Sequence, residues 1–141
     1  MNSDFSISVD DQAIATITWD CEKKSMNVLS FEALETLEKL IDQIINDDQI
    51  IAGIITSGKR DFAAGMDLNV LAQLKQSAGE NPAEGVFNGV MKMHSVLRKI
   101  ELAGMDPKTK KGGKPIVSVL PGTALGIGLE IPLSTHRVFS A

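Results

Sequence analysis

The segment from Pro115 to Arg137 constrains the fold more than any other part of the sequence. It opens with a run of apolar, largely β-branched residues, 116–120, which is typical of a buried strand. A Pro-Gly pair then interrupts the strand. Two further glycines, Gly126 and Gly128, allow the backbone to turn sharply and to lie close to a ligand. The segment therefore predicts a strand, a glycine turn and the start of a helix.

The expected helix covers residues 129–134, and Pro132 is tolerated there only within the first turn. A helix start after a glycine turn places free backbone N–H groups and the positive end of the helix dipole at one point. Glu130 lies three residues after Ile127 and adds an acid or base to that point. The segment thus predicts a site that stabilises negative charge, although Glu130 alone is better explained as a glutamate that offsets the helix dipole than as a catalytic residue.

The composition excludes several classes of function. The length of 141 residues predicts one domain, and a net charge of −4 argues against a nucleic-acid or anionic-membrane surface. No apolar run is long enough for a membrane span, and the polar N-terminal residues do not resemble a signal peptide. Cys21 is the single cysteine and the two histidines are far apart, so we expect no disulfide, no metal site and a cytoplasmic location.

The rest of the chain predicts an α/β fold, a sheet with helices packed on it. Ser30 is a suitable N-cap for the first helix, and the strand that follows that helix lacks alternation, as if covered on both faces. The expected strands are 6–9 and 13–19, which form a hairpin, then 50–56 and 116–120. The expected helices are 31–46, 68–76, 84–102 and 129–134.

Three further features have plain structural explanations. The helix over 84–102 carries Val86, Phe87, Val90, Met91, His94, Leu97 and Ile100 along one face. His94 is expected to be a structural residue of that face, and His136 a cation at a helix end. The lysine-rich residues 103–114 predict an exposed loop.

Two nucleotide-binding motifs are excluded. The third glycine of a dinucleotide-binding Gly-x-Gly-x-x-Gly pattern would fall on Ile131, so the glycines near residue 126 do not complete it. A Gly-x-x-x-x-Gly-Lys-Ser/Thr phosphate loop is also absent from the sequence.

Three motifs instead resemble those of a known family. They are Lys24-Ser-Met-Asn-Val-Leu29, Phe62-Ala-Ala-Gly-Met-Asp-Leu68 and Gly122-Thr-Ala-Leu-Gly-Ile-Gly-Leu-Glu130. Their order and spacing are similar to the signature segments of the crotonase, or enoyl-CoA hydratase/isomerase, superfamily. The likeness covers essentially the whole chain. The inserted segment 103–114 looks like the hydratase half of bacterial multifunctional fatty-acid oxidation proteins, which continue into a 3-hydroxyacyl-CoA dehydrogenase.

The resemblance implies a truncated crotonase-like spiral of ββα units and a substrate bound as a coenzyme A thioester, without a metal or a covalently bound cofactor. The backbone N–H groups of Met66 and Ile127 would hold the thioester oxygen, and Glu130 would act on the water. The full-length protein would be a trimer-based homo-oligomer. The residues implied to bind substrate or coenzyme A are Lys24, Met26, Ala64, Gly65, Asp67, Leu68, Asn69 and Gly126.

The sequence departs from the family pattern at several positions. Ile127 stands where a third glycine is usual, Pro121 replaces an asparagine, and Asn69 stands where many members carry a lysine. Hydratases also use a second glutamate that would lie beyond Ala141. We therefore expect residues 1–141 to be the N-terminal portion of a crotonase-like domain, with little or no activity alone.

The main hypothesis is an enoyl-CoA hydratase of fatty-acid β-oxidation, which adds water to a trans-2-enoyl-CoA. One alternative is another reaction on the same scaffold, namely double-bond isomerisation, C–C cleavage or thioester hydrolysis. A second alternative is a non-catalytic unit that binds acyl-CoA or another protein.

Overall fold

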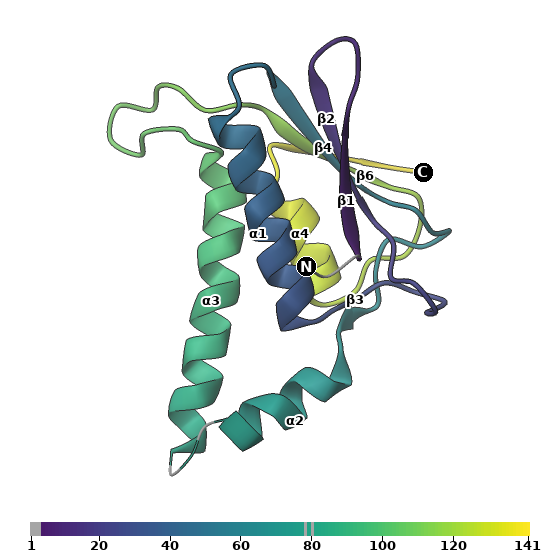
Figure 1. Ribbon diagram of the computed structural model, residues 1–141, viewed down its shortest axis with the longest axis vertical. Helices are drawn as coiled ribbons and strands as arrows, with labels where there is room; N and C mark the ends of the chain where they lie inside the picture. The colour runs from purple at the N-terminus through teal and green to yellow at the C-terminus, as the bar shows by residue number, and fades with distance from the viewer. Residues whose placement is uncertain (1–3, 78, 80) are drawn as a thin grey trace.

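The structure is a computed structural model and describes residues 4–77, 79 and 81–141. Figure 1 shows a twisted sheet with the longer helices on one side of it. The elements, in chain order, are β1 (Phe5–Val9), β2 (Ile14–Trp19), β3 (Val28–Leu29), α1 (Phe31–Asn46), β4 (Ala52–Ser57), β5 (Gly65–Met66), α2 (Leu68–Ser77), α3 (Pro82–Leu102), β6 (Ile116–Leu120), α4 (Ile127–Leu133) and β7 (Arg137–Ser140).

The main sheet has the strand order β1-β2-β4-β6-β7. The β1–β2 pair is antiparallel, as the predicted hairpin requires, and all the other pairs are parallel. Each parallel crossover carries helical structure, and the short strands β3 and β5 pair with each other in a second, two-stranded sheet. The predicted α/β class, a sheet with helices packed on it, is thereby confirmed.

Helix α1 is the central covering element of the sheet. Its predicted limits are confirmed, because the Ser30 hydroxyl accepts a hydrogen bond from the N–H of Ala33 and Asp47 ends the helix. At its C-terminal end, the Lys114 ammonium donates to the carbonyl oxygens of Ile44 and Asp47, both at 2.7 Å. One face of the helix is buried against the sheet: Ala33, Leu34, Thr36, Leu37, Leu40, Ile41 and Ile44.

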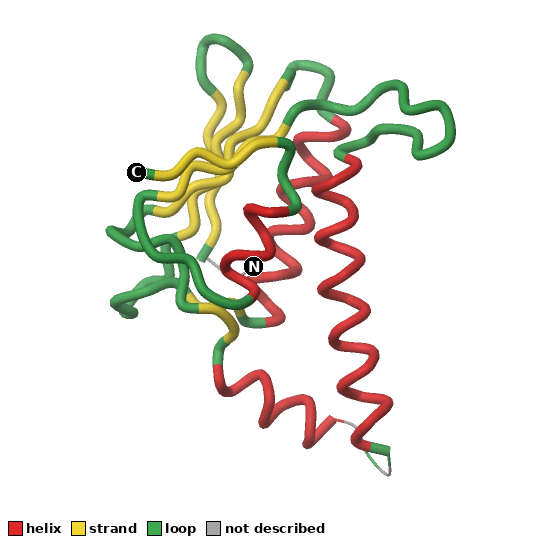
Figure 2. The backbone as a smooth tube through the Cα atoms, turned by 180° about the vertical axis from the view of Figure 1, so that it is seen from behind, coloured by secondary structure: helices red, strands yellow, loops and turns green. Residues whose placement is uncertain are grey.

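Strand β4 is covered less completely than its sequence predicts. Gly53 and Ile55 are buried beneath the helices, whereas Ile54 on the other face is only half-buried. Figure 2 shows from behind that the described helices lie on one side of the sheet. The expectation that both faces of residues 50–56 are covered is therefore wrong for the described residues, because no helix packs on the second face.

The buried face of α3 also differs from the expected one. Gly89, Met93, Val96 and Ile100 are buried, while Phe87 of the predicted face is 62% exposed. Gly89 determines this orientation. A β-carbon at that position would lie 2.8 Å from Leu74 Cδ2 and 3.1 Å from Phe31 Cζ, so the missing side chain lets three helices approach.

Helix α4 begins at Ile127, two residues earlier than predicted, with Gly126 as its N-cap. Consequently Pro132 lies in the second turn, and the prediction that it falls in the first turn is wrong. The cost is limited because the helix ends one residue later, so the proline removes a single N–H from a short helix.

His136 joins strand β6 to helix α3. Its Nδ1 accepts a hydrogen bond from the N–H of Ile116 at 2.9 Å, and its Nε2 lies 2.9 Å from the carbonyl oxygen of Glu101. Nδ1 must be unprotonated to accept, so Nε2 carries the proton and donates. His136 is therefore a structural residue, as predicted, and it links β6 to the C-terminal end of α3.

Candidate active site

Two glycine-containing loops lie side by side at the end of the sheet. We call residues 58–67 the first loop and residues 121–126 the second loop. The N–H groups of Phe62 and Ala63 both donate to the carbonyl of Thr123, at 2.8 and 3.1 Å. In return, the N–H of Leu125 donates to the carbonyl of Ala63 at 3.0 Å. These backbone contacts fix the two loops as one unit, although they are distant in sequence.

Missing side chains allow this close approach. Gly65 has a φ of +110°, and a β-carbon there would lie 3.3 Å from the carbonyl oxygen of Leu125. At Gly128 a β-carbon would lie 2.6 Å from the β-carbon of Ala63, which is closer than real atoms come. The glycines singled out in the sequence therefore serve the contact between the two loops as well as their turns.

Asn27 anchors the first loop from below. Its side chain is fully buried, and its amide nitrogen donates to the carbonyl oxygens of Trp19 and Phe62, both at 2.9 Å. The amide oxygen accepts from the N–H of Cys21 at 2.8 Å, and the backbone carbonyl accepts from Ala64. Sequence reasoning missed this role. The available signal was a lone amide between the apolar residues of the first motif.

Asp61 connects the first loop to the second. Its carboxylate accepts the N–H of Thr123 at 2.9 Å, and this hydrogen bond holds the pKa of Asp61 below its usual value. The second loop has no buried side-chain amide comparable to Asn27 among the described residues, since Pro121 stands near its start. Its position therefore depends on the first loop.

The two expected oxyanion donors lie on either side of this contact. Met66 ends β5, and Ile127 is the first residue of α4. The N–H of Ile127 has no hydrogen-bond acceptor within the described part of the chain, as expected at a helix start. Its side chain is 7% exposed and belongs to the core, which fixes the direction of its N–H group. This geometry suits an oxygen that gains negative charge.

A pocket of about 290 Å³ opens beside these donors. It brings together Met66 of the second motif with Ile127 and Glu130 of the last one. Among the described residues the Glu130 carboxylate has no side-chain partner, so it is available to a ligand. The full lining is Met66, Val90, Met93, His94, Gly126, Ile127 and Glu130.

Helix α3 supplies one wall of this pocket, which the sequence did not predict. Val90, Met93 and His94 come from its middle. His94 was expected to be structural, but the structure places it in the pocket that also holds Glu130. Only the long-range packing of α3 reveals this, because nothing in the local sequence relates it to the glycine loops.

Several residues predicted to bind coenzyme A lie together where the first loop ends and α2 begins. The Lys24 ammonium and the Asp67 carboxylate form an ion pair at 2.5 Å, and the N–H of Asn69 donates to Asp67 at 2.9 Å. Lys24, and then the N–H of Asn69, hold the pKa of Asp67 below its usual value. Asp67 in turn raises the pKa of Lys24.

The other predicted binding residues are arranged around this ion pair. Leu68 is 83% exposed at the start of α2, Ala64 is exposed, and Met26 is half-buried beside Asn27. Gly65 and Gly126 form the loop contact itself. The structure thus brings all the predicted residues to one region, and their contacts with a ligand stay a prediction.

The lysine-rich loop does not reach this region. Figure 1 shows it at the opposite end of α3 from α2. Within the described ranges, no cluster of three or more metal-ligating side chains is present. No helix in the same ranges is long and apolar enough to cross a membrane.

Comparison with known sequences supports the motif assignment. The sequence model of a family described as Enoyl-CoA hydratase/isomerase matches residues 14–140. The chain is 28% identical over 138 residues to the fatty acid oxidation complex subunit alpha of Shewanella oneidensis, covering 97% of this chain and 17% of that protein. It is 30% identical over 123 residues to the short-chain-enoyl-CoA hydratase of Clostridium acetobutylicum, covering 86% of this chain and 40% of the relative.

Solved structures show the same fold. An enoyl-CoA hydratase from Bacillus anthracis superposes with a TM-score of 0.76 at 24% identity, over 98% of this chain and 47% of that one. An enoyl-CoA hydratase/isomerase from Marinobacter aquaeolei gives a TM-score of 0.81 at 16% identity, over 99% and 49%. The chain therefore spans less than half the length of each of these relatives.

Proposed function

The chain belongs to the enoyl-CoA hydratase/isomerase family, and from that premise we propose that the intact protein adds water to a trans-2-enoyl-CoA in fatty-acid β-oxidation. The single observation that carries the proposal is the pocket in which Glu130 faces the start of α4 and the end of β5. This constellation joins a carboxylate to two backbone N–H groups beside a cavity. It is the arrangement that addition to an acyl thioester needs.

In the proposed reaction, the thioester oxygen accepts hydrogen bonds from the N–H groups of Met66 and Ile127. Glu130 binds a water and takes its proton as the water oxygen bonds to the β-carbon. Electrons of the double bond move to the thioester oxygen as an enolate, which the two N–H groups stabilise. A proton then returns to the α-carbon, giving the 3-hydroxyacyl-CoA.

The ion pair between Lys24 and Asp67 supports a role in coenzyme A binding. Lys24 is fixed by Asp67, and its side chain is still 46% exposed. An ammonium held by Asp67, the residue that follows Met66 of the pocket lining, is suited to the phosphates of coenzyme A. Coenzyme A is then bound as part of the substrate, next to Lys24 and Asp67.

The decisive test is Glu130→Gln in the intact protein. We expect kcat for crotonyl-CoA hydration to fall about 10²-fold or more, because a positioned acid/base group contributes that much. Affinity for a saturated acyl-CoA, measured by calorimetry, should stay unchanged. Glu32→Gln is the matched control, since Glu32 also lies in the first turn of a helix but on α1, away from the pocket. Equal rates for Glu130→Gln and the control would refute the role.

Isomerisation of the double bond is the second candidate. It uses the same constellation, because Glu130 beside the two N–H donors can also act as the base of that reaction. A single base can move a proton between the α- and γ-carbons. Assays with cis-3-enoyl-CoA and trans-2-enoyl-CoA separate the two reactions. Measurable acyl-CoA affinity without turnover of either substrate would favour the non-catalytic binding unit.

The assembly of the intact protein is also a proposal. We infer a trimer-based homo-oligomer, and the exposed leucines of the second loop and α4 (Leu125, Leu129 and Leu133, at 54%, 40% and 67%) support burial of that face in a larger structure. The family resemblance implies a dehydrogenase in the same polypeptide, and the match to a fatty acid oxidation complex subunit, of which this chain covers 17%, is consistent with that. Sedimentation of the intact protein and an assay for NAD-dependent oxidation of 3-hydroxyacyl-CoA test these two points.

A further inference from the structure

Met66 and Met93 line two different spaces. One is the pocket that contains Glu130. The other is an apolar recess behind it, and both methionines belong to the lining of each. The two side chains therefore form the shared wall between the recess and the proposed reaction site.

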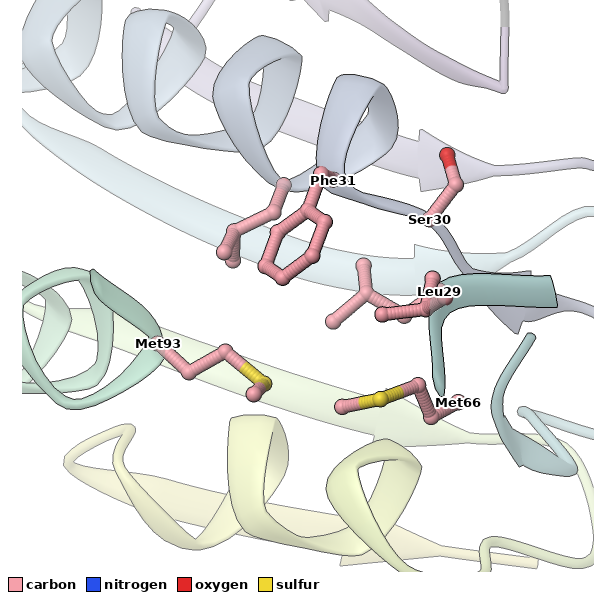
Figure 3. A pocket seen from close by; sticks show the side chains of 7 residues that line it. Leu29, Ser30, Phe31, Met66 and Met93 are labelled. Atoms are coloured by element: carbon pink, nitrogen blue, oxygen red, sulfur yellow. The ribbon is translucent and has the colours of Figure 1, made fainter. Parts of the chain in front are cut away.

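The recess is closed in this structure. The volume it leaves for a water molecule is about 0 Å³, compared with about 290 Å³ for the pocket. Figure 3 shows the sulfur-bearing ends of Met66 and Met93 pointing toward each other, with Phe31 above them. The complete lining is Leu29, Ser30, Phe31, Leu34, Met66, Val70 and Met93.

The chemistry of the recess suits a hydrocarbon chain. All its lining residues except Ser30 are apolar, and the Ser30 hydroxyl is already engaged with the N–H of Ala33 at 3.1 Å. No charged group lines it. A polar ligand entering the recess would lose its hydrogen bonds to water without replacement.

The wall is built from movable side chains. Methionine is unbranched, with three rotatable bonds, so it can change rotamer where a branched residue would not. The surrounding wall is more rigid, because Leu29 and Leu34 are at most 2% exposed and Phe31 packs close to the backbone at Gly89. Movement of the two thioethers is therefore the simplest way to open the recess.

The open pocket itself has limited capacity. Its 290 Å³ corresponds to roughly ten water-sized volumes. A space of that size favours a short acyl chain over a long one. A longer acyl chain needs additional apolar space, and the recess adjoins the site where the thioester is proposed to bind.

We propose that Met66 and Met93 form a gate that determines acyl-chain length. Short chains are held in the pocket with the gate closed, whereas longer chains bind only when the methionine side chains move and admit the chain end to the recess. This inference rests on the proposed function, because it takes the substrate to be an acyl-CoA. It names the residues that select among such substrates.

The test compares four-carbon and ten-carbon substrates in the intact protein. The wild type should show a higher kcat/KM for the four-carbon enoyl-CoA. Met93→Ala should raise the ratio of ten-carbon to four-carbon kcat/KM roughly tenfold or more, since each buried methylene is worth about fourfold. Met91→Ala, on the same helix but 47% exposed and outside both linings, is the matched control and should leave the ratio unchanged.

A second variant and a binding measurement keep the test decisive. Met66→Ala retains the backbone N–H and should shift the ratio in the same direction, so it decides the question if Met93→Ala does not fold. Calorimetry with saturated four- and ten-carbon acyl-CoAs gives the same ratio without catalysis. Turnover with an unchanged ratio in both variants would overturn the gate and leave the proposed function intact. Absence of turnover together with a shifted binding ratio would overturn the proposed function and support the gate.

Discussion

The two loops of the site are held in different ways. The first loop, residues 58–67, is anchored to the core by the buried amide of Asn27, which makes hydrogen bonds to Trp19 and Cys21 at the end of β2 and to Phe62 in the loop. The second loop, residues 121–126, is held by backbone hydrogen bonds to the first loop and by the carboxylate of Asp61. The second loop thus depends on the first one.

This difference implies an order of dependence within the site. Since the core positions the first loop directly, a change in the second loop should leave the first one in place. A change beneath the first loop should displace both oxyanion donors, because the second loop moves with it. The substitutions below test that order, from the largest expected effect to the smallest.

Asn27→Ala should have the largest effect. It leaves the carbonyl of Phe62 and the N–H of Cys21 buried without a partner, while the carbonyl of Trp19 keeps only the N–H of Gly58, so we expect a loss of about 3 kcal/mol or more in the free energy of unfolding. Urea denaturation measures it. Asn46→Ala removes one exposed amide hydrogen bond and is the control. A loss below about 1 kcal/mol for Asn27→Ala would contradict the anchoring role.

Gly128→Ala tests the contact between the loops. Alanine in place of glycine normally favours a helix, but here its β-carbon would lie 2.6 Å from that of Ala63. We expect a net loss of about 1–3 kcal/mol, the usual cost of overpacking. The double variant Ala63→Gly/Gly128→Ala removes the clash and should recover part of that loss. Additive effects in this double-mutant cycle would show that the two positions do not press on each other.

Acidification should weaken the contacts of Asp67 at the end of the first loop. The pKa of Asp67 is lowered in the folded state by Lys24 and by the N–H of Asn69. The resulting stability is fully present above the unfolded pKa of about 3.9 and is lost as the pH falls through the lower folded value. Asp67→Asn should therefore flatten the dependence of unfolding free energy on pH below about pH 4. If the unfolding free energy of Asp67→Asn changed with pH as steeply as that of the wild type, Asp67 would be excluded as a source of the pH dependence.

Asp61→Ala should have the smallest and most local effect. It removes the acceptor for the N–H of Thr123 and leaves the Asn27 contacts in place. We expect faster hydrogen exchange at the Thr123 amide and unchanged exchange at the Ala64 amide, which donates to Asn27. Asp61→Asn keeps an acceptor oxygen and serves as the control. Faster exchange at Ala64 in Asp61→Ala would reverse the proposed order of dependence.

Local signals in the sequence predicted much of the fold. The N-cap Ser30 and the apolar spacing after it gave the limits of α1, and the hairpin of β1 and β2 followed from its β-branched runs. The face of α3 could not be predicted in this way. Its apolar residues occupy more than one face, and the buried one is selected by the approach of Phe31 and Leu74 to Gly89.

The residues of the site also fall into those that local sequence predicts and those that only the folded chain reveals. Its backbone donors and Glu130 lie within two short motifs, so spacing and resemblance were sufficient to place them together. Asn27, His94 and Met93 take part through contacts with residues far away in sequence. The hydrogen bonds of Asn27 form only in the folded chain. The same is true of the two cavities that Met93 lines.

The crossover from β4 to β6 has a consequence for sequence change. Its return to the sheet is fastened, because Lys114 donates to the last carbonyls of α1 and His136 links the start of β6 to α3. Beyond the Met105–Gly112 bridge, the tip at residues 106–111 is exposed and bonded mainly to itself. Because loop closure depends weakly on length, insertions and deletions at this tip can accumulate without moving the strands or the site.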